Sequence, residues 1–60
     1  MTVQRAVSIA KNPAMADETE RADAWATLRM EANRASANSV IRATRQEYAD
    51  SIISYEQSAQ

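Results

Sequence analysis

Four acidic side chains lie close together in the first half of the chain, and they are the residues best placed to bind a metal ion. They are Asp17, Glu18, Glu20 and Asp23. On a helix, Glu20 and Asp23 would present their carboxylates on one face, as a hard cation such as Ca²⁺ requires. The same acids also suit the first turn of a helix, where the helix dipole stabilises negative charge. We favour this second interpretation and expect no bound metal ion or cofactor.

The residue types that most catalytic mechanisms require are missing. The chain contains no His and no Cys, so it lacks the usual proton shuttle at neutral pH and the most reactive nucleophile. The Glu-x-x-His pairs that hold metal ions in helical bundles cannot occur either. We therefore expect a protein that is not an enzyme and that has no small-molecule substrate.

Large apolar and aromatic side chains are stronger candidates for function, because they could contact another protein. In the second half of the chain they recur in steps of three and four residues, which places them on one face of a helix. A single helix cannot bury its own apolar stripe, so a second helix, from this chain or from a partner, must cover it. The stripe consists of Ile41, Thr44, Tyr48, Ile52, Tyr55 and Ala59.

Trp25 is the only Trp of the chain, and Trp is enriched among the residues that dominate protein interfaces. The neighbouring alanines leave its large ring little cover within the chain, so we expect it to anchor an interface. Arg42 and Arg45 are expected to point away from the centre of the stripe and, with Arg34, to form a modest basic group at the surface. The predicted partner interface consists of Trp25, Leu28, Met30, Ile41, Tyr48, Ile52 and Tyr55.

The elements that must position these residues are predicted to be helices, because the chain has no Gly and a single Pro. Asn12 and Pro13 form the clearest helix start, since Asn is a good N-cap and Pro is preferred at the first helical position. Asn33 could end that helix in the left-handed conformation. Ser36 or Asn38 could cap the helix that follows.

Two points of the fold stay open at this level. Residues 2–11 fit either a short helix or a strand, because both periodicities are present. Residues 33–38 fit either a turn or the middle of one continuous helix of about 65 Å. The prediction is an all-α fold with one domain, residues 1–60, made of an N-terminal arm, residues 1–12, and a helical hairpin, residues 13–32 and 39–57.

The first predicted helix carries two apolar faces instead of one. Trp25 lies on one of them and Leu28 lies on the roughly opposite face. Two apolar faces suggest contacts on both sides, as in a helix sandwiched within an assembly. The first face comprises Met15, Ala22, Trp25, Ala26 and Ala32, and the second comprises Ala24, Leu28 and Met30.

Composition limits what this chain can do alone. Hydrophobic residues make up 45% of the 60 residues, but 13 of them are Ala, which buries little surface. A domain of this size is marginally stable, so we expect a partner, most simply a second copy. The formal charge of −1 argues against a surface that binds phosphates or anionic membranes. No apolar run is long enough to cross a bilayer, and the expected location is the cytoplasm or a virion assembled there.

One stretch resembles a known family. Residues 36–43, Ser-Ala-Asn-Ser-Val-Ile-Arg-Ala, are similar to the start of the second helix in ribbon-helix-helix proteins, which are small dimeric repressors and type II antitoxins. In that family, backbone N–H groups at this helix start bind a DNA phosphate. The resemblance implies that Ser8 and Ala10 lie on a strand in the major groove, and that Ile41 and Tyr48 lie in a dimer core. It places Ser36, Asn38, Ser39 and Arg42 at the phosphate.

These patterns together predict a non-enzymatic helical protein that self-associates or docks on a larger protein. Such a chain would serve as a structural or regulatory component of a bacterium or phage. The alternative is a DNA-binding repressor or antitoxin of the ribbon-helix-helix type.

Overall fold

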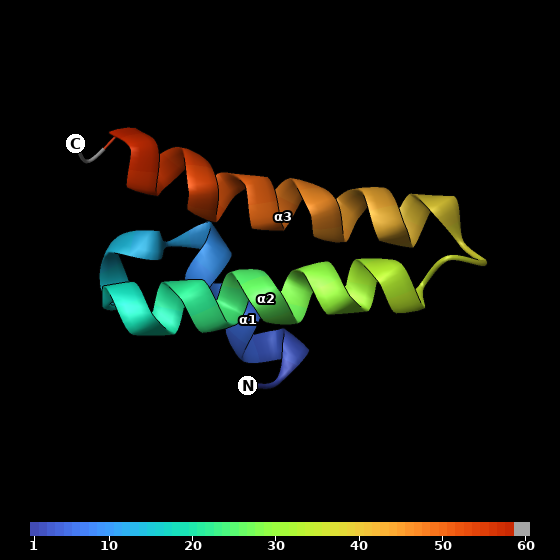
Figure 1. Ribbon diagram of the computed structural model, residues 1–60, viewed down its shortest axis with the longest axis horizontal. Coiled ribbons are helices and arrows are strands. Elements are labelled where there is room, and N and C mark those ends of the chain that lie inside the picture. The colour runs from blue at the N-terminus through green and yellow to red at the C-terminus, as the bar shows by residue number, and fades with distance from the viewer. Residues whose placement is uncertain (59–60) are drawn as a thin grey trace.

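The computed structural model describes residues 1–58, which form three α-helices and a short 3₁₀ helix and contain no strand (Figure 1). α2 and α3 run antiparallel as a hairpin, and α1 crosses this pair on one side and packs against both helices. The all-α prediction is therefore confirmed, while Ala59 of the predicted stripe lies outside the described residues. The elements are α1, Val3–Lys11, the 3₁₀ helix, Pro13–Met15, α2, Glu18–Arg34, and α3, Ser39–Ser58.

Each α-helix begins directly after a residue whose side chain accepts a hydrogen bond from the backbone of the first turn. Such caps satisfy N–H groups that have no partner within the helix. The short oxygen-bearing side chains thus decide where the helices start. The three capping residues are Thr2 before α1, Asp17 before α2 and Asn38 before α3.

The predicted start of the first long helix at Pro13 is wrong. Pro13 begins only the 3₁₀ turn, and Ala16 then takes an extended conformation, with φ −123° and ψ 154°. Asp17 is the stronger cap, because its Oδ1 accepts a hydrogen bond of 2.8 Å from the backbone N–H of Glu20. The spacing of Asp17 and Glu20 matches that of a capping box. Arg21 donates from Nη1 to the carbonyls of Pro13 and Ala16, which fixes the connection in place.

The connection between α2 and α3 is a turn, so the continuous helix of about 65 Å does not form. The longest dimension of the described chain is 35 Å. Asn33 does not end α2 in the left-handed conformation, because the helix continues to Arg34 and no residue within 1–58 has a positive φ. Ala35 ends the helix with φ −84° and ψ 25°, and its carbonyl accepts a 2.9 Å hydrogen bond from the N–H of Asn38.

The open question about residues 2–11 is answered by α1. This segment is a helix that packs against both of the others, and the predicted hairpin with a separate arm is replaced by a three-helix arrangement. The helical periodicity prevails because it brings small and apolar side chains to one face, which the hairpin then buries. The residues that α1 buries are Ala6, Ile9 and Ala10.

The core is built from one large side chain per helix, surrounded by alanines. Ile9 of α1, Leu28 of α2 and Ile52 of α3 are the largest fully buried side chains. Alanine at the remaining contact positions allows the helices to approach closely, although it contributes little apolar area. The buried alanines are Ala6, Ala10, Ala16, Ala24, Ala32 and Ala49.

Within the chain, α2 buries one face, which combines residues of the two predicted apolar faces. The buried row has a spacing of four residues and consists of Ala24, Leu28 and Ala32. Met30 is 65% exposed and Met15 is 50% exposed, so these two side chains do not belong to the core. The sequence pattern is misleading here because alanines occur on every side of this helix, and only contact with α1 and α3 selects which of them are buried.

We expect Leu28→Ala to lower the free energy of unfolding by about 2–5 kcal/mol, because it deletes one of the three large core side chains. Met30→Ala is the matched control on the same helix, and its exposed side chain predicts a change within about 0.5 kcal/mol. Urea unfolding followed by circular dichroism measures both. Equal destabilisation by the two substitutions would contradict the assignment of the core face.

Candidate functional site: a groove between α1 and α3

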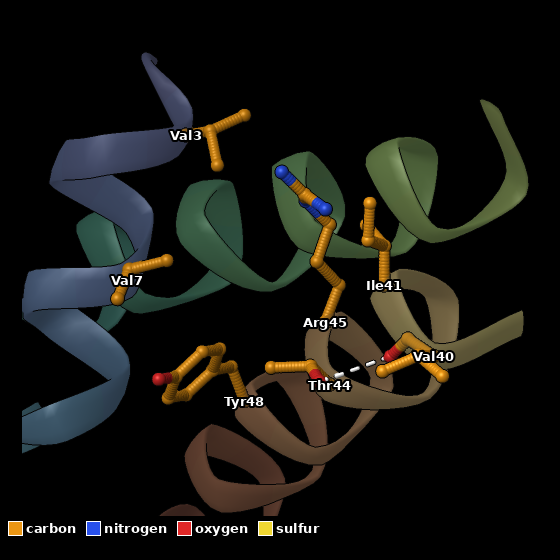
Figure 2. Close-up of a pocket in the computed structure, with 7 residues that line it drawn as sticks. All are labelled: Val3, Val7, Val40, Ile41, Thr44, Arg45 and Tyr48. Carbon is orange, nitrogen blue, oxygen red and sulfur yellow. Dashed lines mark hydrogen bonds between the residues drawn. The ribbon is translucent and has the colours of Figure 1, made fainter. Parts of the chain in front are cut away.

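A groove of about 220 Å³ opens between α1 and the first turns of α3 (Figure 2). Val3 and Val7 of α1 face it from one side, and Ile41 and Tyr48 of α3 face it from the other. Aliphatic and aromatic groups thus form most of its wall. We call this feature the α1–α3 groove, and its lining residues are Val3, Val7, Val40, Ile41, Thr44, Arg45 and Tyr48.

The groove exists because α1 crosses the α2–α3 hairpin and covers only part of the apolar stripe of α3 (Figure 1). Ile52, near the far end of the stripe, is 1% exposed, while Ile41 at its beginning is 41% exposed and the adjacent Val40 is 73% exposed. The stripe was predicted to need a covering helix, and the structure covers only its second half.

Arg45 is the one charged residue among those that line the groove. Its guanidinium lies between Val3 and Ile41 (Figure 2), and its Nε is buried without a hydrogen-bond partner. No ion pair among the described residues includes Arg45. The prediction that Arg45 points away to the surface is therefore wrong.

Helical spacing could have located Arg45. It precedes Ala49 by four residues and Ile52 by seven, and both of these side chains are fully buried. Residues at this spacing share one helix face, so Arg45 continues the core-facing row by one further turn. This row shares Ile52 with the predicted stripe, and its charged members Arg45 and Glu56 hide it from a search for apolar periodicity.

The structure does not bring the seven predicted interface residues together. Ile41 and Tyr48 line the groove, whereas Leu28 and Ile52 are fully buried in the core of the chain itself. Met30 lies on α2 beside a separate hollow lined also by Met1 and Ala26. A partner that binds the folded chain could meet the groove or the Met30 surface, but not the two core residues.

The two remaining aromatic residues of that prediction each lie beneath an arginine. Trp25 is partly buried against the core, and the guanidinium carbon of Arg29 lies 5.8 Å from its ring centre. Tyr55 is partly buried, and the guanidinium carbon of Arg21 lies 5.1 Å from its ring centre. Cation–π contacts of this kind stabilise the ring within the chain. Part of the Trp25 ring is therefore covered by Arg29 and by the core of the same chain.

The residues that the family resemblance places at a DNA phosphate lie around the start of α3. Ser36 is in the turn, Ser39 is the first helical residue, and Arg42 is exposed one turn later. Asn38 Oδ1 already accepts hydrogen bonds of 3.1 and 3.2 Å from the N–H groups of the second and third helical residues. The amides that would bind a phosphate therefore have an acceptor within the chain.

The strand that the same resemblance implies is not formed. Ser8 and Ala10 lie on α1, where Ala10 is buried and the Ser8 hydroxyl donates to the carbonyl of Gln4. Because this segment is helical, Ala10 lies in the core and is not accessible to a DNA base.

The four acidic residues near the start of α2 have structural roles or are exposed. Asp17 caps α2, and Glu20 forms an ion pair of 3.1 Å with Arg5 of α1. Glu18 and Asp23 are exposed. Within residues 1–58, no group of three or more His, Cys, Asp or Glu side chains could hold a metal ion.

We expect Arg45→Met to raise the free energy of unfolding by about 1 kcal/mol, because it keeps the length of the side chain and removes a buried, unpartnered polar atom. Arg21→Met is the matched control. It should lower that free energy by about 2 kcal/mol, since the carbonyls of Pro13 and Ala16 lose a charged donor. Thermal and urea unfolding measure both variants, and a loss of stability in Arg45→Met would show that this side chain has a partner.

We expect Asn38→Ala to lower the free energy of unfolding by about 0.5–2 kcal/mol, because the first turn of α3 loses its cap. Ser36→Ala, in the exposed turn, should change it by less than about 0.5 kcal/mol. Urea unfolding of the two variants tests this assignment. A larger effect at Ser36 would identify that residue as the cap.

Comparison with known proteins matches the chain to no family model, no curated protein and no solved structure. Within residues 1–58, none of the helices combines the length and the hydropathy needed to span a bilayer.

Proposed function

We propose that this chain is a non-enzymatic interaction protein that uses the α1–α3 groove to associate with itself or with a larger protein. The observation that carries the proposal is the uncovered first half of the α3 stripe, where Val40 and Ile41 are exposed beside Val3 and Val7. Single exposed apolar residues are ordinary on protein surfaces, but a contiguous apolar groove is typical of a binding site. The role would be that of a structural or regulatory component of a bacterium or phage, in the cytoplasm or in a virion assembled there.

Burial of the exposed apolar side chains at this surface would favour association. Complete burial of an aliphatic side chain such as Val40 or Ile41 contributes roughly 1.5–3 kcal/mol. A partner helix laid into the groove would complete the layer that α1 leaves unfinished, and helix-in-groove recognition uses this geometry.

We expect the double substitution Val40→Asp and Ile41→Asp to abolish association while the fold is retained, because both side chains are exposed in the isolated chain. Ala43→Asp, an exposed site on the same helix outside the groove, is the matched control. Sedimentation over a wide concentration range measures self-association, and quantitative capture from an extract of the source cells measures docking. The proposal fails if the groove variant and the parent chain agree in mass and in every captured protein.

DNA binding is the alternative function that we propose. It is supported by the resemblance of residues 36–43 to ribbon-helix-helix proteins and by a polar hollow beside the turn, where Arg42 lies with Asn33, Ser39 and Gln46. The helical state of residues 3–11 means that a strand could not read the major groove without refolding of α1.

If the chain binds DNA, retention on duplex DNA should weaken steeply between roughly 50 and 200 mM salt. Arg42→Gln should reduce retention, whereas the groove variant should leave it unchanged. Absence of retention at the lower salt concentration would eliminate this alternative.

A further inference from the structure

We infer that the occupant of the α1–α3 groove is an amphipathic helix of a partner protein that places a carboxylate against Arg45. This inference rests on the docking role proposed above and adds the chemistry of the occupant. It follows from the charge, the size and the symmetry of the groove.

The charge of the groove has one sign. Arg45 is its only charged lining residue, and no ion pair of the described chain engages that guanidinium. The charged side chains of α1 are Arg5 and Lys11, so this helix contributes no acidic group. The Nε of Arg45 is buried, so its guanidinium is partly removed from water. A charge-assisted hydrogen bond from a partner's carboxylate is stronger in such an environment than in water.

The size of the groove favours a few inserted side chains. Its volume of about 220 Å³ is below the range of roughly 300–1,000 Å³ that is usual for small-molecule pockets. On α3 the lining runs from Val40 to Tyr48, a rise of about 12 Å at 1.5 Å per residue. Two turns of an amphipathic helix match this length and can present apolar side chains with an acid on their flank.

The symmetry of a self-association argues against a second copy in this position. Two chains that met groove to groove about a twofold axis would bring their Arg45 guanidiniums together. Because no described acidic residue lines the groove, this like-charge contact would have no local compensation, and such contacts disfavour association. A carboxylate from a different protein has no such penalty.

The test uses two designed peptides and the whole chain. The first is an Ala-rich helical peptide of about 18 residues, long enough to be helical in water, with a Leu stripe flanked by Glu. Its twin carries Lys in place of every Glu. Each peptide is titrated into isotopically labelled protein, and the backbone amide shifts of Val3, Ile41 and Thr44 report binding in the groove, with Ser54 as a distant reference.

We expect the Glu peptide to bind at least about tenfold more tightly than the Lys twin, in line with the strength of a hydrogen bond between charged groups. In Arg45→Met the difference between the peptides should fall below about threefold, with the helical content unchanged. Equal binding of both peptides to the parent chain would overturn the inference about charge and leave the docking role intact.

Two further outcomes separate the inference from the proposed function. If neither peptide shifts the groove amides, the inference is wrong, and if the chain also does not self-associate, the docking role at this surface is wrong as well. If the chain self-associates and the Val40→Asp and Ile41→Asp variant does not, the occupant is a second copy. That outcome overturns the inference while supporting the proposed function.

Discussion

The structure depends on three large side chains that meet at the centre of the chain, one from each helix. Ile9, Leu28 and Ile52 are fully buried, and the other buried residues are alanines. Alanine allows close approach of the helices but adds little apolar area. Each helix therefore contributes a share of the core that the other two cannot replace. This explains why residues 3–11 pack into the fold as α1 and do not extend from it as an arm.

The position of α1 also creates the groove. α1 crosses the hairpin and packs in the core with Ile52, whereas the half of the α3 stripe where Ile41 lies stays uncovered. The apolar surface that remains is continuous with the core, so a partner helix placed there would extend the packing already present within the chain.

Two arginines at partly buried positions each have a buried Nε without a hydrogen-bond partner but differ in their other contacts. Arg21 donates to two carbonyls, approaches Glu56 at 3.5 Å and lies over the ring of Tyr55. Arg45 has a buried Nε without a partner in an apolar wall. A buried charge is tolerated when its hydrogen-bonding groups are satisfied. Arg21 meets that condition at Nη1, while its buried Nε makes no hydrogen bond and only approaches Glu56. The partner that we infer would supply the missing ion pair for Arg45.

The sequence by itself determined the helical class and the span of α3, predicted as 39–57 and observed as Ser39–Ser58, while it left residues 33–38 open between a turn and a continuous helix. It also identified Ile41 and Tyr48 among the groove residues. These features depend on helical periodicity and on caps that act within a few residues. Tertiary structure alone decided which alanines are buried and which part of the α3 stripe stays uncovered. Those outcomes depend on contacts between helices, which bring together side chains that are distant in the sequence.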